Sequence, residues 1–283
     1  MLGLSTKTCQ DRLRDTRQFL EAARVGRVVD LARLSPGRVV SYLRSRSADY
    51  EPASLRNVAS SVRDFLRFAQ EQGWTSQSLD RAVPRIACGA QNDLPAYLTQ
   101  PQLRLLLASW NSPTAENRRN LAIALCLARL GLRAGEVAAL ALEDLNWREA
   151  TLRIKQSKNG HPAQLPLLSD VGRAIADYLR RSRPVCQHRQ VFLLHRSARP
   201  MSAQAVSQVI RNGLRRCAIQ VPRPGAHLLR HTLASHLVQN GASLKEVADL
   251  LRHRDLNSAS VYAHVDLPNL RSLAQPWPLE ARP

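Results

Sequence analysis

The chain has 283 residues, enough for two ordinary domains that each bury a core of their own. With 44% hydrophobic and 22% charged residues, its composition excludes an intrinsically disordered protein. Lysine and arginine number 41 against 22 aspartates and glutamates, and this net charge of +19 favours a polyanionic partner, nucleic acid first.

The N-terminal stretch MLGLSTKTCQDRLRD turns polar at once and has no signal-peptide core. The longest apolar run, LAIALCLA at 121–128, is too short to cross a bilayer. The five cysteines are widely spaced and include no C-x-x-C pair, so neither a disulfide framework nor a zinc ribbon is predicted. We expect a cytoplasmic protein with reduced thiols and no membrane segment.

The first 83 residues predict a compact domain of four helices. In SLRNVASSVRDFLRFAQEQG, apolar residues recur three and four positions apart on one helical face, and Gly73 ends the helix. Ser35 followed by Pro36 is a cap and first-turn signature of a shorter helix before it. The other side of the longer helix faces either a DNA backbone or water, and its arginines are candidate DNA-binding residues: Arg56, Arg63 and Arg67.

The rest of the chain predicts a linker and a mixed domain. Periodicity stops in PRIACGAQNDLPAYL, and Thr99 then caps a new helix. NLAIALCLARLGLR predicts a buried helix ended by Gly131, and TLRIKQSKNGHPAQLPL predicts two strands around a turn at 158–160. The expected fold is mainly α with a small β-sheet or hairpin (α+β), organised as a helical domain (1–83), a linker (84–98), a second domain (99–275) and a tail (276–283).

The stretch HLLRHTLASH, at 227–236, places three histidines and an arginine within ten residues. His227 and His231 have the spacing used by zinc proteases, but the motif H-E-x-x-H requires a glutamate where Leu228 stands. No nearby cysteine or paired carboxylate offers a third ligand, so we expect neither a metal nor another cofactor. His227 and Arg230 lie one helical turn apart on the same face, and we interpret them as phosphate-binding residues, with His231 and His236 structural or secondary.

Further cationic residues fit the phosphate interpretation. Arg133 follows a helix-ending glycine and begins the next helix, where backbone amides and the helix dipole also favour an anion. Lys158 lies at the predicted hairpin tip, and LLRHRDLNSASVYAHV contains His253 and, nine residues later, Tyr262. Each residue alone has a plainer explanation, as a surface arginine, a core histidine or a packed aromatic. Their combination is what points to a function.

This ordered set of Arg, Lys, His-x-x-Arg, His and Tyr resembles the tyrosine recombinases, also called phage-type integrases. The resemblance covers nearly the whole chain, with a helical core-binding domain followed by a catalytic domain. Its most specific part is HLLRHTLASHLVQNGASLKEVADLLRHRDLNSASVYAHV, where the H-x-x-R-H-T box, the L-x-H box and the tyrosine fall at family spacing. The resemblance implies a site-specific recombinase or integrase of bacterial or mobile-element origin.

The implied reaction passes through a covalent 3′-phosphotyrosine. Tyr262 would attack the scissile phosphate and release a 5′-hydroxyl, with His227 as the candidate base, because a phenol of pKa about 10 needs activation at neutral pH. Arg133 and Arg230 would hold the oxygens of the transition state in place of metal ions, and His253 would hydrogen-bond the same oxygens. The covalent bond conserves the phosphodiester's free energy, so neither metal nor ATP is required.

The leaving 5′-oxygen needs a proton, which by resemblance comes from Lys158, since lysine can release a proton and arginine effectively cannot. Lys158 is not flanked by glycine here, so Lys155 is an alternative; Lys158 is preferred because it lies at the turn. A second departure is Arg252, which stands before His253 where many members have glycine. It either contacts a DNA phosphate or points to solvent.

The segment after the tyrosine, DLPNLRSLAQPWPLEARP, carries an apolar stripe. In relatives this segment docks on a neighbouring protomer and links a tetramer on two DNA duplexes. Packing on its own chain, or a frayed tail, fits the sequence equally well. The expected partners are therefore double-stranded DNA and further copies of the chain.

Other functions explain part of the pattern. Two helices separated by Gly241, with Ser243 and Glu246 as a capping box, fit a non-catalytic helix-turn-helix DNA reader. That interpretation leaves Arg133, Lys158 and Tyr262 without a role. A type IB topoisomerase-like relaxing enzyme or a hairpin-telomere resolvase would share the cleavage chemistry, but the two-domain plan and modest length favour a recombinase.

Overall fold

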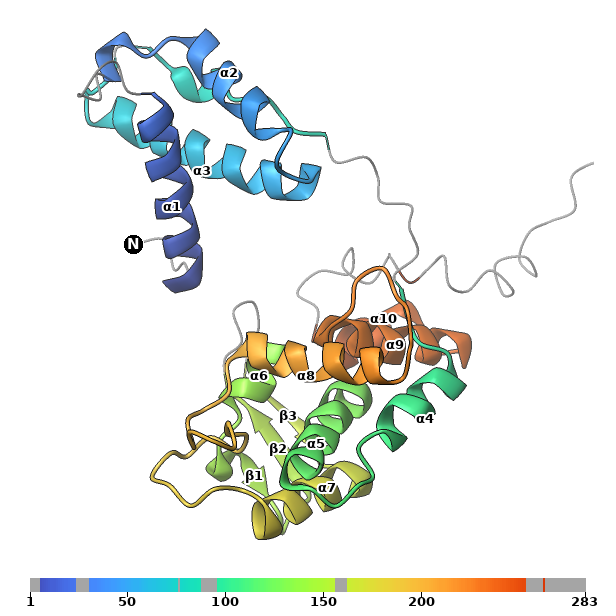
Figure 1. Cartoon of the computed structure of the whole chain (residues 1–283). Coiled ribbons are helices and arrows are strands. Elements are labelled where there is room, and N and C mark those ends of the chain that lie inside the picture. Colours follow the sequence, from blue (N-terminus) through green and yellow to red (C-terminus); the bar gives the residue numbers. More distant parts are fainter. Residues whose placement is uncertain are drawn as a thin grey trace, which may run out of the picture. The chain divides into compact units, whose positions relative to one another are not determined.

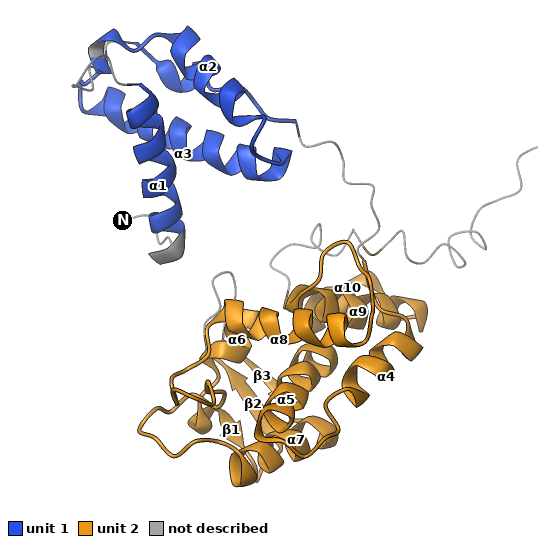
Figure 2. Cartoon of the chain, in the orientation of Figure 1, with its two compact units in different colours: residues 1–92 blue, residues 93–283 orange. Residues whose placement is uncertain are grey.

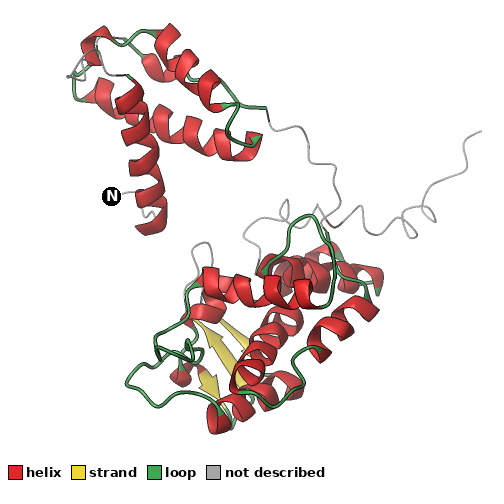
Figure 3. Ribbon diagram, viewed as in Figure 1, coloured by secondary structure: helices red, strands yellow, loops and turns green. Residues whose placement is uncertain are grey.

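The computed structural model describes residues 6–23, 31–75, 77–87, 96–155, 162–252 and 262. The chain divides into two compact units, which we call unit 1 (residues 1–92) and unit 2 (residues 93–283) (Figure 2). The division falls within the stretch that shows linker composition. Among the described residues helices dominate, and the strands form one small antiparallel sheet (Figure 3), which confirms the predicted fold class.

Unit 1 is helical (Figure 1). Its elements are α1 (Thr6–Ala22), η1 (Leu31–Arg33), α2 (Pro36–Arg46), α3 (Pro52–Glu71) and η2 (Leu79–Ala82). The described residues of this unit thus form three α-helices and two short 3-10 helices, where the sequence suggested four helices. The element η2 stays at one turn because Pro84 disfavours helical backbone at Val83 and lacks an amide hydrogen.

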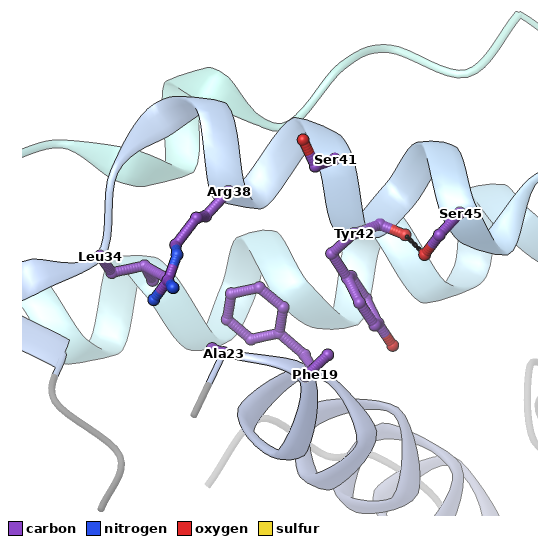
Figure 4. Close-up of a pocket in the computed structure, with 8 residues that line it drawn as sticks. Phe19, Ala23, Leu34, Arg38, Ser41, Tyr42 and Ser45 are labelled. Carbon is purple, nitrogen blue, oxygen red and sulfur yellow. Dashed lines mark hydrogen bonds between the residues drawn. The ribbon is translucent and has the colours of Figure 1, made fainter. Parts of the chain in front are cut away.

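The apolar stripe of α3 forms the core of unit 1, as predicted. Val58 and Val62 are at most 3% exposed, and Gly73, at φ 71°, follows the end of the helix. Phe19 of α1 meets the ring of Tyr42 of α2 edge-on, with 5.2 Å between centroids. Figure 4 shows these two rings in a pocket between α1 and α2, where the Ser45 hydroxyl donates to the Tyr42 carbonyl.

Unit 2 is built around α5, which contacts helices on several sides. Its elements are α4 (Gln100–Ala108), α5 (Ala115–Leu130), α6 (Ala134–Ala139), η3 (Leu142–Asp144), β1 (Leu145–Asn146), β2 (Thr151–Ile154), β3 (Ala163–Pro166), α7 (Ser169–Arg181), α8 (Ala203–Arg216), α9 (Ala226–Gln239) and α10 (Leu244–Leu250). Helix α5 packs against α7 and α9, while α6 packs against α8. The middle of α5 is fully buried, as its apolar sequence predicts.

The sheet of unit 2 is antiparallel, in the order β1-β2-β3. Strands β2 and β3 are the predicted pair, with Leu152 opposite Leu165. Their connecting turn at 158–160 lies outside the described residues. Strand β1 was not predicted, because two residues carry no alternating pattern.

Capping residues fix where α4 and α10 begin and where α5 ends. Thr99 caps α4, as predicted, and forms a capping box with Gln102 that was not predicted. Ser243 forms the predicted capping box with Glu246 at the start of α10. Gly131 ends α5 in the left-handed conformation at φ 58°. None of the described helices combines the length and apolar composition that a bilayer crossing requires.

Candidate active site

Arg133 is held by a carboxylate at the start of α6. Because Gly131 ends α5, the chain turns at once and Arg133 becomes the N-cap residue of the next helix. Its backbone N–H donates to Glu136 Oε2 and its Nη1 donates to Glu136 Oε1, each at 2.9 Å. Glu136 is only 7% exposed, so a buried charge fixes both the backbone and the side chain of Arg133.

Arg230 lies on α9 and is 2% exposed. Its Nη1 donates to the carbonyl of Gly131 and its Nη2 to the carbonyl of Leu251. Burial lowers the pKa of Arg230 to about 10, and the charges of Arg133 and Arg252 contribute to that lowering. The guanidinium still carries its charge at neutral pH.

The two arginines meet at the end of α10. Arg133 Nη2 donates to the Arg252 carbonyl at 3.4 Å, and Arg230 donates to the preceding carbonyl, that of Leu251. Residues from α6, α9 and the turn after α10 are thereby joined in one network. Such a network fixes the position of two guanidinium groups before any anion arrives.

Arg252 points inward. Its side chain is 11% exposed, and its Nη2 donates to Glu136 Oε2 at 2.7 Å. Its backbone adopts φ 54°, the left-handed region that glycine enters most easily. Burial acts to raise the pKa of Glu136, but the Arg133 amide and the charges of Arg252 and Arg133 outweigh it, so that this pKa lies below its usual value.

Tyr262 is buried between α9 and α10. It is 1% exposed and packs in a small cluster that includes Ala234, Val238 and Leu251. Its Oη lies 2.7 Å from His231 Nδ1. Burial raises the pKa of Tyr262 to about 12, although the charge of Arg230 acts to lower it.

His227 lies beside this pair. Its ring meets the ring of His231 edge-on, with 4.6 Å between centroids. The surrounding protein keeps water from part of the ring and lowers the pKa of His227, and the charges of Arg230 and Arg133 lower it further, although the residue as a whole is exposed. A lowered pKa favours the neutral imidazole at neutral pH.

Of the site residues expected from sequence, Arg133, His227, Arg230 and Tyr262 lie in this part of unit 2. Lys158 and His253 lie outside the described residues. The alternative lysine, Lys155, follows β2 and contacts two carboxylates, Asp144 Oδ1 at 3.2 Å and Glu143 Oε1 at 3.5 Å.

The arginines of α3 have different surroundings. Arg56 is exposed. Arg63 Nη2 donates to the carbonyls of Val83 and Pro84, each at 3.3 Å, and therefore ties the end of η2 to α3. Arg67 Nε lies 3.8 Å from a carboxylate oxygen of Asp80.

Glu136 was not singled out from the sequence, and His231 was not predicted to contact the tyrosine. Glu136 is the third residue of α6, the position whose carboxylate accepts from the N-cap backbone N–H in a capping box, and this half of the signature could have identified it. His231 was expected to be structural or secondary, yet it contacts the phenol. Among the described residues, no group of three or more His, Cys, Asp and Glu side chains is arranged to hold a metal ion.

Comparison with known proteins identifies the two units. A family profile described as "Phage integrase family" matches residues 96–267, and one described as "Phage integrase, N-terminal SAM-like domain" matches residues 2–73. The chain is 35% identical to the "Putative integrase/recombinase y4rA" of Sinorhizobium fredii, covering 99% of this chain and 68% of that protein. It is 27% identical to the tyrosine recombinase XerC of Halalkalibacterium halodurans, covering 92% of this chain and 87% of that protein.

Solved structures share the fold. A XerH site-specific recombinase bound to a palindromic difH substrate aligns with a TM-score of 0.72 at 17% identity, covering 94% of this chain and 78% of that chain. A lambda integrase dimer bound to a COC′ core site aligns with a TM-score of 0.72 at 18% identity, covering 99% of this chain and 94% of that chain. At these identities the likeness shows the fold.

Proposed function

The chain belongs to the phage integrase family of tyrosine site-specific recombinases, and from this premise we propose that it cleaves and rejoins double-stranded DNA through a covalent 3′-phosphotyrosine at Tyr262. One arrangement carries the proposal. Arg133 and Arg230 donate to consecutive carbonyls, those of Arg252 and Leu251. The residue after Arg230, His231, is hydrogen-bonded to the hydroxyl of Tyr262. Two fixed cations, of which Arg230 is close enough to act on the phenol of Tyr262, suit attack on a phosphodiester.

The arginines are suited to the charge of the transition state. Attack by Oη on phosphorus places extra negative charge on the non-bridging oxygens, and a planar guanidinium can donate to two oxygens at once. Arg133 and Arg230 each use part of their donor set on the protein, which fixes their orientation in advance. Under this proposal neither a metal ion nor ATP takes part.

The remaining roles follow from the resemblance. His253 hydrogen-bonds the phosphate, and Lys158 protonates the leaving 5′-oxygen. The contacts of Lys155 with Asp144 and Glu143 favour Lys158 over Lys155 for this step, because they hold the Lys155 ammonium group against two carboxylates of the protein.

The proposed partners are DNA and further copies of the chain. A lambda integrase of this fold, with a TM-score of 0.71 at 18% identity, was solved as a tetramer bound to a Holliday junction. We extend that assembly to a homotetramer on two DNA sites, linked by the segment after Tyr262, which lies outside the described residues. Because the proposed substrate is DNA, we infer that the protein is cytoplasmic and associates with the nucleoid when it is bound to DNA.

The test uses a DNA site selected from a random pool by binding to the purified protein. The wild type, given this site with a nick in EDTA, should form an adduct that survives denaturant and disappears with protease. Tyr262→Phe should bind the same DNA equally well and form no adduct. An adduct formed by the variant, or a strict metal requirement, would contradict the proposal, whereas a non-catalytic DNA reader would form none with either protein.

A further inference from the structure

The contact between His231 and Tyr262 joins a titratable side chain to the oxygen that would become the nucleophile. The two atoms, Nδ1 and Oη, are 2.7 Å apart. At this distance the phenol donates its hydrogen when Nδ1 carries none, and a proton can pass along the same line.

A base is needed because Tyr262 is protonated in its buried position. The ring is 1% exposed among apolar side chains, and a neutral phenol is a weak nucleophile. Within the described part of the chain, the hydrogen-bond partner of Tyr262 Oη is His231. His227 contacts the ring of His231.

The backbone around His231 is well anchored. Its neighbours in the chain, Arg230 and Thr232, are 2% and 0% exposed. Thr232 Oγ1 accepts from the Leu98 amide at 2.9 Å and donates to the Leu228 carbonyl at 2.8 Å. A side chain between two such anchors keeps its distance to the reacting oxygen with little conformational freedom to lose.

We propose that His231, and not His227, is the general base of DNA cleavage by this protein, an inference that rests on the proposed function. As the Oη–P bond forms and the P–O5′ bond breaks, the phenolic proton moves to His231 Nδ1, and the leaving 5′-oxygen takes a proton from a separate acid. In rejoining, the 5′-hydroxyl returns its proton to the conjugate base of that acid and attacks phosphorus, the P–Oη bond breaks, and the imidazolium returns its proton to Oη. His227 then serves as a phosphate ligand.

The experiment measures single-turnover adduct formation on the selected site with His231→Ala and His231→Asn. The amide oxygen of asparagine can lie near the position of Nδ1 and accept the same hydrogen bond, but it cannot take up a proton. Loss of a general base should slow both variants by roughly 10²–10⁴-fold without weakening DNA binding. If His231→Asn keeps the wild-type rate, the contact only positions the tyrosine and the proposal is wrong.

His236→Asn is the matched control, because it makes the same change on the same helix at a residue whose Nδ1 contacts Gln100. Its rate should stay within about threefold of the wild type. If the hydrogen bond from His231 instead holds Tyr262 in an unreactive position, His231→Ala should react faster than the wild type. That result would overturn the proposal.

A second measurement alters the nucleophile. Replacing Tyr262 with a ring-fluorinated tyrosine makes the phenol more acidic, so it should restore much of the rate lost in His231→Ala while changing the wild-type rate little. An equal effect in both backgrounds would contradict the proposal. Absence of an adduct in the wild type, by contrast, would refute the proposed function itself, so the two failures are distinguishable.

Discussion

At the scale of single residues, Glu136 is the one negative charge that the described residues place between Arg133 and Arg252. Replacing it with glutamine leaves two guanidinium groups close together without a counter-charge. We expect Glu136→Gln to lower the free energy of unfolding by roughly 1–3 kcal/mol at pH 7, the usual penalty for a buried polar contact left incomplete. Urea denaturation measures this, with the exposed Glu149→Gln as a control that should change little.

The same pair of proteins tests the sign of the pH dependence. The pKa of Glu136 in the folded protein is lowered, so its stabilising contribution is present above the unfolded value of about 4.3 and is lost as pH falls through the folded value. The stability difference between the wild type and Glu136→Gln should therefore be constant from about pH 5 to 7 and shrink below about pH 4. A difference that grows in acid would show that the carboxylate is not held by these arginines.

The side chain of Arg252 forms an ion pair with Glu136, but its backbone adopts a conformation that is unfavourable for a residue other than glycine. Both Arg252→Gly and Arg252→Ala remove the ion pair with Glu136, but only glycine adopts φ 54° without strain. We expect the alanine variant to be less stable than the glycine variant by about 1 kcal/mol. Thermal unfolding of the two variants decides this, and the reverse order would mean that residue 252 does not adopt the left-handed backbone in solution.

At the scale of elements, Gly213 permits the close approach of α8 to Trp110. A Cβ at Gly213 would lie 2.4 Å from Trp110 Cζ2 and 2.9 Å from Leu106 Cδ1, and the tryptophan is 1% exposed. Alanine is the better helix former by about 1 kcal/mol, but the overlap should outweigh that gain and leave Gly213→Ala less stable by roughly 1–3 kcal/mol.

Gly135→Ala is the matched control for this substitution, because a Cβ there meets nothing within 4 Å and the residue also lies in a helix, α6. It should be neutral or slightly stabilising in the same urea titration. If Gly213→Ala is also neutral, α8 must be able to shift away from the indole ring.

The elements that could be predicted from the sequence are those that depend on residues close together in the chain. The caps at Thr99 and Ser243 and the apolar periodicity of α3 depend on neighbouring residues, so the sequence reveals them. The roles of Glu136 and His231 depend on partners 116 and 31 residues away along the chain, Arg252 and Tyr262. Only the packing of α6, α9 and the end of α10 brings those partners together.

At the scale of the whole molecule, the two units have separate cores, one centred on α3 and the other on α5. Both units have more lysine and arginine than aspartate and glutamate. The excess charge is therefore not confined to the catalytic unit, and a DNA duplex can be attracted by either part of the chain. Binding should accordingly depend on salt even where no base is read.

This dependence gives a prediction for the full chain and for one arginine. If at least six phosphates are neutralised, affinity for a non-specific duplex should fall by about 10³-fold or more between 50 and 200 mM salt. Arg56 is exposed on α3, so Arg56→Gln should make the slope of log K against log salt less negative by about 0.9 if it neutralises one phosphate. The neutral neighbour Ser54→Ala should leave the slope unchanged. If the slope is unaltered in Arg56→Gln, Arg56 does not contact a DNA phosphate, because the slope reports the number of counterions released from the DNA on binding.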